Sequence, residues 1–459
     1  MNRKSAWTKY DGASMNLINA FAREYRGFID HCKTERECAA ELVKTAKAAG
    51  FADLEQIVRE HRPLKPGDRV FRNWMNKSVV MFIVGRQPLA DGMQILGAHI
   101  DSPRIDLKQN PLYEEDGLAY LDTQYYGGIK KYQWVALPLA MHGVIVRIDG
   151  SVLNVSIGEN EDDPVFCISD LLPHLADEQL KKNGETLIEG EALNLIIGGY
   201  PLPDTEKEPV KAAILKLLKE KYGVEEEDFL SAELELVPAG KSRDMGLDGS
   251  MILGYGHDDR VCAYPSARAI LDYTGTPERT LCAVLTDKEE IGSVGATGMR
   301  SHYFENIVSE LYHCVGEYSE FGVKQALANS RMLSSDVSAA FDPNFASAFE
   351  KKNAAYLGCG VCFNKYTGGS GKHGSSDANA EFIGALRGIM QANDVTYQFS
   401  ELGKVDLGGG GTIAYMCAKY CMNVIDCGVP VLSMHAPWEV ISKVDLYEAY
   451  KCYCAFLKA

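Results

Sequence analysis

A short apolar segment followed by adjacent acids constrains the fold of this chain most. Residues 280–286 are mostly apolar and tolerate extended backbone, which predicts a buried strand. Glu289 and Glu290 follow closely, and the glycines of residues 292–298 then require tight turns. Open α/β sheets bind their ligands just beyond the carboxyl ends of buried strands. The acidic pair therefore indicates a functional edge, although a solvated acidic turn would account for two glutamates by themselves.

The rest of the chain is predicted to form the sheet to which that edge belongs, together with its flanking helices. Apolar spacing predicts helices first, and strands and helices alternate again after residue 248. The predicted strands cover residues 69–74, 78–85, 93–100, 249–254, 280–286, 355–363, 395–400 and 423–426. The predicted helices cover residues 12–32, 34–49, 260–271, 376–393, 412–420 and 442–457. This alternation predicts an α/β domain with a mixed, mostly parallel sheet flanked by helices.

Residues 105–242 have a different character. Tyrosines and glycines cluster at residues 125–128, and residues 201–209 are rich in proline and charge. The alternating segments 143–149 and 151–157 indicate short strands. We therefore predict a β-rich domain inserted at residues 105–242. The main domain is then discontinuous and comprises residues 1–104 and 243–459.

Composition limits the location and the partners of the chain. The formal net charge of −16 disfavours nucleic acid or an anionic membrane as the main partner. The longest apolar stretch, residues 135–146, is broken by Pro138 and His142 and is too short to span a bilayer. The N-terminal residues lack the apolar segment of a secretory signal. Thirteen cysteines, many of them among apolar neighbours, indicate reduced core thiols. We expect a soluble cytoplasmic protein.

Five points along the chain pair a predicted strand end or loop with side chains that can bind metal. They are His99 with Asp101, Asp258 with Asp259, Glu289 with Glu290, Asp336, and His435. Residues i and i+2 share one face of a strand, so Asp101 can reach and orient the imidazole of His99. Separately, each point has an ordinary explanation: a buried histidine, an aspartate that caps a helix, or a polar loop residue. Their joint occurrence is the signal.

The residue types define the chemistry. Two histidines with several carboxylates and no cysteine suit a borderline-to-hard divalent ion. Two ions that share a bridging carboxylate suit hydrolysis, because together they activate a water molecule and polarise a carbonyl. A further carboxylate must then carry the proton from water to the leaving amine.

In this order, the motifs resemble those of the aspartyl aminopeptidase family, a branch of the dinuclear zinc exopeptidases that includes bacterial members. The matching segments are residues 97–103, 258–260, 287–293, 335–336, 408–412 and 434–435. The resemblance covers nearly the whole chain. It implies a metal-dependent aminopeptidase that hydrolyses the N-terminal residue from peptides.

The resemblance also implies residue roles and two divalent ions, zinc first, with cobalt or manganese as alternatives. His99 and Asp336 would bind one ion, Glu290 and His435 the other, and Asp258 both. In the catalytic step, Glu289 would act as general base and acid while Asp101 orients His99. The family further has a cis peptide bond after its bridging aspartate.

The same resemblance implies an assembly and a substrate pocket. The inserted domain would pair subunits, with dimers building a tetrahedral dodecamer, and His174 would reach a neighbouring active site. An ordinary helix-start histidine is an equal alternative for His174. Preference for N-terminal Asp or Glu would need a cation, for which Lys365 is the candidate. Gly410 and Gly411 would present backbone N–H groups to the substrate.

Three alternatives remain open. The first is an aminopeptidase with broad or neutral specificity, because the stretch 367–374 departs from the expected pattern of the aspartyl enzymes. The second is an amidohydrolase or deacylase that acts on small N-acyl compounds. The third is a non-catalytic assembly or cargo protein, which would be expected to have lost ligands that this chain retains.

Overall fold

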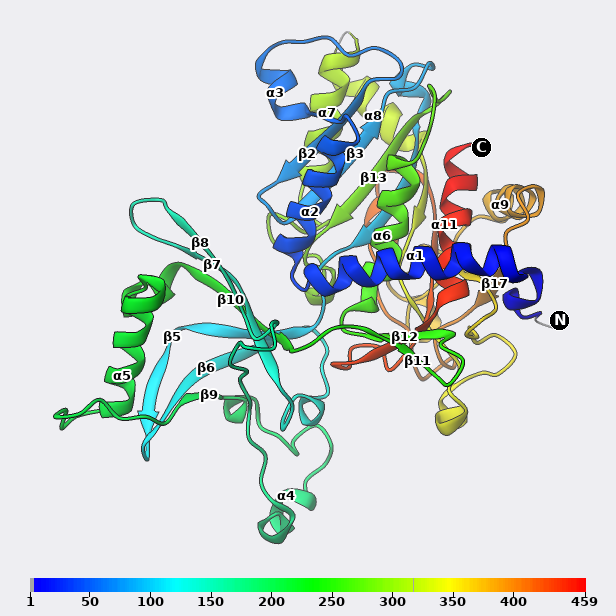
Figure 1. The fold of residues 1–459 in the computed structure, drawn as a ribbon. Helices are drawn as coiled ribbons and strands as arrows, with labels where there is room; N and C mark the ends of the chain where they lie inside the picture. Colours follow the sequence, from blue (N-terminus) through cyan, green and yellow to red (C-terminus); the bar gives the residue numbers. More distant parts are fainter. Residues whose placement is uncertain (1–3, 317) are drawn as a thin grey trace. The chain divides into compact units, whose positions relative to one another are not determined.

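The computed structural model describes residues 4–316 and 318–459. The chain forms two compact units (Figure 1). Unit 1 comprises residues 1–102, 242–434 and 439–459, and unit 2 comprises residues 103–241 and 435–438. The segment 435–438, which lies within the predicted main domain, groups with the inserted segment.

Unit 1 is built on a nine-stranded sheet with the order β1-β2-β3-β13-β4-β14-β18-β16-β17. The strands are β1 (Ala52–Asp53), β2 (Arg69–Trp74), β3 (Ser78–Ile83), β4 (Met93–His99), β13 (Thr280–Thr286), β14 (Arg331–Ser334), β16 (Val361–Asn364), β17 (Tyr397–Ser400) and β18 (Asn423–Gly428). The four central strands β13, β4, β14 and β18 are parallel. Strands β3 and β16, on either side of them, run antiparallel to their central neighbours. The predicted mixed, mostly parallel sheet is confirmed.

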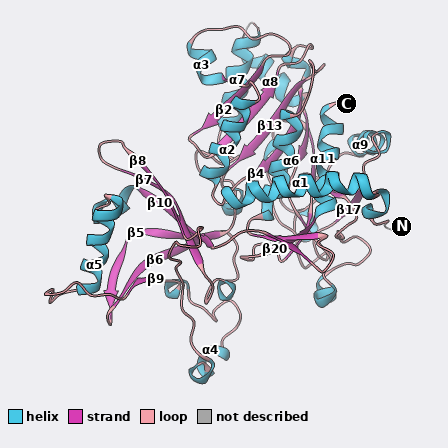
Figure 2. Cartoon of the chain, in the orientation of Figure 1, coloured by secondary structure: helices cyan, strands magenta, loops and turns pink. Residues whose placement is uncertain are grey.

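Helices cover both faces of this sheet (Figure 2). One apolar core lies under α1 (Gly12–His31), α2 (Glu35–Ala48), α6 (His257–Leu271), α9 (Ala380–Ala392) and α11 (Lys443–Leu457). The other lies under α3 (Leu54–Arg59), α7 (Tyr303–Val315), α8 (Glu320–Ala328) and α10 (Ala414–Ala418). Successive residues of β4 enter opposite cores: Leu96 joins the first and Ile95 the second. This double burial explains the continuous apolar runs of the central strands.

A second sheet of five strands also belongs to unit 1, with the order β11-β12-β20-β19-β15. Its strands are β11 (Arg243–Met245), β12 (Met251–Gly254), β15 (Ser338–Ala339), β19 (Pro430–Leu432) and β20 (Glu439–Ser442). Of these strands, only β12 was predicted from the sequence. The others are two to four residues long, which leaves too few positions for a period-two pattern to show.

Unit 2 contains a six-stranded antiparallel sheet with the order β8-β7-β10-β5-β6-β9. The strands are β5 (Arg104–Glu115), β6 (Leu118–Tyr126), β7 (Leu139–Val146), β8 (Val152–Ile157), β9 (Leu195–Gly198) and β10 (Ala232–Pro238). Two short α-helices, α4 (Asp177–Leu180) and α5 (Pro209–Leu217), accompany the sheet. Across both units, no helix in the described residues has the length and apolar character needed to cross a membrane.

Burial at the centre of the main sheet predicts a large stability difference between two truncations. Ile95→Ala removes a fully buried side chain and should lower the free energy of unfolding by about 2–5 kcal/mol. Leu17→Ala truncates a side chain that is 57% exposed and should change it by less than about 0.5 kcal/mol. Urea unfolding followed by circular dichroism measures both. Equal midpoints for the two variants would contradict the assignment of Ile95 to the core.

Candidate metal centre

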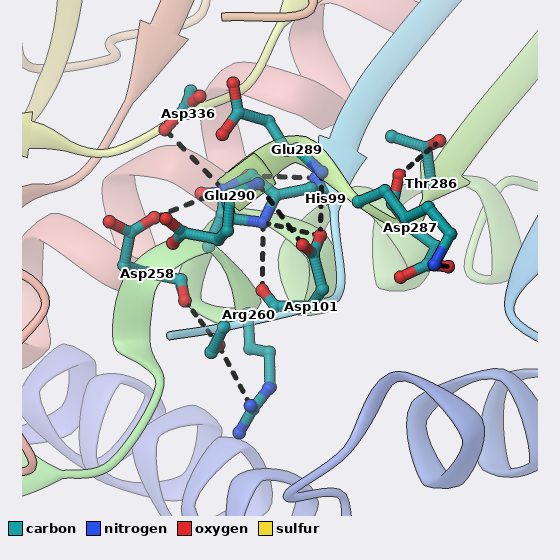
Figure 3. Close-up of polar contacts among 12 residues, drawn as sticks. His99, Asp101, Asp258, Arg260, Thr286, Asp287, Glu289, Glu290 and Asp336 are labelled. Atoms are coloured by element: carbon teal, nitrogen blue, oxygen red, sulfur yellow. Dashed lines mark hydrogen bonds and ion pairs between the residues drawn. The ribbon is translucent and has the colours of Figure 1, made fainter. Parts of the chain in front are cut away.

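The potential metal ligands meet at the carboxyl edge of the main sheet (Figure 3). His99 is the last residue of β4, which lies between the parallel strands β13 and β14. Glu289 and Glu290 begin a 3-10 turn just after β13, and Asp336 follows β14 by two residues. Asp258 stands at the start of α6. Because parallel strands end at the same edge, these four segments converge without long excursions of the chain.

The side chains form overlapping groups of ligand atoms. His99 groups with Glu289 and Asp336. His99 also groups with Asp258 and Glu290. In both groups, the ligand atoms lie within 4.8 Å of one another. The Nε2 atom of His99 is 3.2 Å from Oδ1 of Asp258 and 4.0 Å from Oδ1 of Asp336.

Asp101 holds two parts of this edge together. Its backbone oxygen lies 3.0 Å from Nδ1 of His99, and its Oδ1 lies 3.4 Å from the same nitrogen. Its two carboxylate oxygens also accept hydrogen bonds, each 3.2 Å long, from the backbone N–H groups of Glu289 and Glu290. Asp101 therefore orients the imidazole and also fixes the glutamate turn. The second contact was not predicted from the sequence, because it joins residues far apart along the chain.

The Asp258 segment is held from both sides. Its peptide bond to Asp259 is cis, as the family resemblance implied. Ser102 Oγ donates a 2.6 Å hydrogen bond to the backbone oxygen of Asp258, and Arg260 Nη2 donates to Ser102 Oγ at 2.9 Å. The backbone N–H of Asp258 donates to Glu439 Oε2 at 3.0 Å.

Asp258 does not cap the helix. Gly256 occupies the N-cap position of α6, and the backbone angles of Asp258 and Asp259 are not helical. The Asp258 carboxylate faces His99 instead (Figure 3). The contacts from Ser102, Arg260 and Glu439 were not predicted, because they depend on how separate segments of the chain meet.

Buried negative charge dominates the electrostatics. Burial, with repulsion from Asp258, raises the pKa of Asp259 well above its usual range despite the opposing effect of His99. Burial and repulsion from Asp259 likewise raise the pKa of Asp336. Burial lowers the pKa of His99, but hydrogen bonds to Asp101 and Asp258 outweigh it and raise that pKa well above its usual value.

These residues fit a divalent metal. Oδ1 of Asp259 is buried and has no hydrogen-bond partner among the described residues, which therefore do not satisfy all the carboxylate oxygens of the cluster. Crowded carboxylates beside one imidazole are relieved by a cation, and oxygen with nitrogen donors suits zinc and similar ions.

The predicted ligand His435 lies in the segment that belongs to unit 2. Its Nδ1 is 2.9 Å from the backbone oxygen of Gly128, in the same unit. The ligand groups found among the described residues do not include His435. Its role as a ligand stays a prediction.

The remaining predicted residues lie outside the ligand groups. His174 is exposed on a 3-10 turn of unit 2, Pro173–Leu175. Lys365 is 49% exposed, and its Nζ is 3.9 Å from Oδ1 of Asp377. The N–H group of Gly410 donates to the backbone oxygen of Thr367 at 2.7 Å. The roles of Gly410 and Gly411 in substrate binding stay predictions.

A histidine and carboxylates at the carboxyl edge of an α/β sheet are residues that suit a metal-dependent hydrolase. The chain belongs to the peptidase M18 family, described as aminopeptidase I zinc metalloprotease, which its sequence matches over residues 28–457. The protein is thus a metalloaminopeptidase, and the resemblance to zinc aminopeptidases is confirmed.

Known relatives match the chain along its whole length. A probable M18 family aminopeptidase 1 of Clostridium acetobutylicum is 56% identical over 455 residues, which are 99% of this chain and 98% of the relative. The crystal structure of an M18 family aminopeptidase from Thermotoga maritima is 40% identical with a TM-score of 0.94 and covers 100% of this chain and 99% of its own. The S. cerevisiae mApe1 dodecamer, 19% identical with a TM-score of 0.78, covers 96% of this chain and 97% of its own and is similar in fold alone.

Close backbone packing near Asp336 generates a testable prediction. A Cβ atom added to Gly428, at the end of β18, would lie 1.8 Å from the backbone oxygen of Asp336. Gly428→Ala must therefore shift Asp336, and we expect at least about tenfold weaker metal binding, as when the support of a ligand is lost. Competition with a chelator of known affinity measures this.

A second glycine supplies the matched control. Gly388 lies within α9, and a Cβ atom there would meet nothing within 4 Å. Gly388→Ala should leave metal affinity unchanged and stabilise the helix slightly. If Gly428→Ala bound metal as tightly as Gly388→Ala, the backbone of Asp336 would not be essential to the site.

Proposed function

We propose that this aminopeptidase works with two divalent ions, zinc first, held by His99, Asp336, Asp258, Glu290 and His435. The observation that supports the pair of ions is the position of Asp258. It belongs to one ligand group with Glu290 and to another with Asp336. A carboxylate shared between two groups is what a bridging ligand requires.

Metal bound there would polarise the scissile carbonyl and lower the pKa of a water molecule. The chain itself then has to move protons, and Glu289 is the proposed carrier from water to the leaving amine. Glu289 is only partly buried, which leaves room for a substrate to approach. Asp101 holds the backbone of Glu289 and so fixes where that carboxylate begins. Gly411 is proposed to donate its N–H group to the substrate.

The role of Glu289 is tested by separating metal content from turnover. Glu289→Gln should retain both ions yet lower kcat by about 10²-fold or more, because an amide cannot accept the proton. Glu290→Gln should instead lose metal, and Glu320→Gln, on the exposed surface of α8, should change neither. Metal analysis after dialysis, together with initial rates, distinguishes the three. Wild-type turnover by metal-loaded Glu289→Gln would remove Glu289 from the proton path.

Two lysines are candidates for the cation that would bind an acidic first residue of the substrate. Acidic preference would use the charge of Lys365 or of Lys372. Both lysines face Asp377, at 3.9 and 3.1 Å respectively. Lys372 also lies over the ring of Tyr366, 4.1 Å from its centroid. A substrate carboxylate would have to displace Asp377, so these contacts favour broad or neutral specificity over a preference for Asp and Glu.

A substrate panel tests the activity and the specificity together. Metal-loaded protein should release the chromophore from aminoacyl amides with a free amine, and a chelator should abolish release. Rates should be highest for substrates with a neutral N-terminal residue. Highest rates for Asp or Glu would instead support Lys365 as the residue that determines specificity. N-acetylated versions should not react. Faster reaction of the acetylated compounds would favour the deacylase alternative, and no reaction with any member would favour the non-catalytic one.

We also propose a homo-oligomer in which unit 2 pairs subunits. Leucines beside His174 are strongly exposed, at 49% for Leu172 and 68% for Leu175, as expected of a surface that another subunit covers. The S. cerevisiae mApe1 structure, which is similar in fold, is described as a dodecamer. Sedimentation of the protein as a monomer at micromolar concentration would contradict this proposal. A reducing compartment such as the cytoplasm is proposed from the thirteen cysteines, most of which are buried.

A further inference from the structure

A polar cleft opens at the amino edge of the main sheet in unit 1. It measures about 540 Å³. Its lining consists of Gln87, Asp91, Arg279, Ala328, Asn329, Arg331 and Asn423. Two arginines and three amide side chains make this lining rich in hydrogen-bond donors. None of these residues belongs to the metal centre described above.

The sheet register fixes where the two arginines lie. Arg279 directly precedes β13, whose first residue Thr280 pairs with Met93 of β4. Arg331 is the first residue of β14 and pairs with Gln94 of β4. The arginines therefore flank the start of β4 on its two sides. His99 ends the same strand, so the cleft and the metal centre are about 20 Å apart along the sheet.

Hydrogen bonds build one wall of the cleft. Arg279 Nη1 donates to the backbone oxygen of Asn329 at 3.1 Å, and the side-chain amide of Asn329 donates to the backbone oxygen of Ala90 at 2.8 Å. The backbone of Asn329 also packs against Gly92, where an added Cβ atom would lie 2.2 Å away. This wall is thus fixed before any ligand arrives, which reduces the entropy that binding would cost.

The positive charge of the cleft is not neutralised within the described chain. No ion pair found among the described residues includes Arg279 or Arg331, and both side chains are only partly buried. Burial and the charge of Arg331 lower the pKa of Arg279, while Asp91 opposes that effect. Asp91 is exposed and supplies one negative charge against two positive ones. Two like charges near each other are unfavourable unless an anion joins them.

We propose that this cleft binds the phosphate group of a small molecule. Guanidinium groups match the oxygens of phosphate with paired hydrogen bonds, and the neighbouring amides supply further donors. With Asp91 counted, the lining carries one net positive charge, which favours an anionic ligand. At about 540 Å³, the cleft has room for a small phosphate ester. The net charge of −16 would repel a long polyanion such as nucleic acid.

Calorimetric titration of the metal-loaded protein with inorganic phosphate, at constant ionic strength, tests the proposal. Wild type should bind saturably, and Arg331→Gln and Arg279→Gln should each bind at least about tenfold more weakly, since each loses a charge-assisted pair of bonds. The matched control is Arg243→Gln, which removes the same charge from an exposed position on β11 and should bind as wild type does. Titration with glycerol 3-phosphate distinguishes a free ion from an ester, according to which binds more tightly.

Three results would overturn the proposal. The first is no saturable binding by wild type. The second is equal affinity in Arg331→Gln, Arg279→Gln and Arg243→Gln. The third is binding that survives both cleft substitutions but disappears on chelation, because phosphate would then sit on the metal. Aminopeptidase rates of the cleft variants should stay at the wild-type level in the absence of phosphate, which also shows that they are folded.

Discussion

Repulsion among buried carboxylates around one imidazole is the constraint on which this structure depends. Asp258, Asp259 and Asp336 approach each other within a few ångströms of His99, and burial raises the pKa of Asp259 and Asp336. Such a cluster is unstable unless a cation neutralises it and the backbone prevents it from spreading apart. The sheet meets the second need. Central strands buried on both faces, together with the contacts from Asp101 and Ser102, hold the ligands at fixed positions before metal binds.

Patterns that are local in sequence predicted the central strands and the ligand types. The apolar run 280–286 became β13, and the run before His99 became β4, because burial on both faces leaves a clear apolar signature. The predicted helices at 12–32 and 442–457 agree with α1 and α11 to within one or two residues. The types of the ligand residues could be predicted for a similar reason, because acids that directly follow apolar strands form a recognisable local pattern.

Contacts that join distant segments were not predictable in the same way. Asp101 was expected to orient His99, but its bonds to the N–H groups of Glu289 and Glu290 depend on the pairing of β13 with β4. The close approach of Gly428 to Asp336 could not be predicted from the sequence either, because a glycine before a valine forms no distinctive pattern. Loop residues were the hardest: the hydrogen bond that uses the Gly410 N–H group, and the ion pairs of Asp377, follow from loop paths that no periodicity describes.

The discontinuity of unit 1 has a consequence for synthesis on the ribosome. Residues 1–102 supply His99, but Asp336 emerges only after the whole of residues 103–241 and another strand-rich segment have been made. The long segment of unit 2 is contiguous, so it can fold while β4 still lacks β14 beside it. During that interval an apolar strand is exposed at an open sheet edge. Between the emergence of residue 99 and that of residue 334, β4 thus lacks one of its two neighbouring strands.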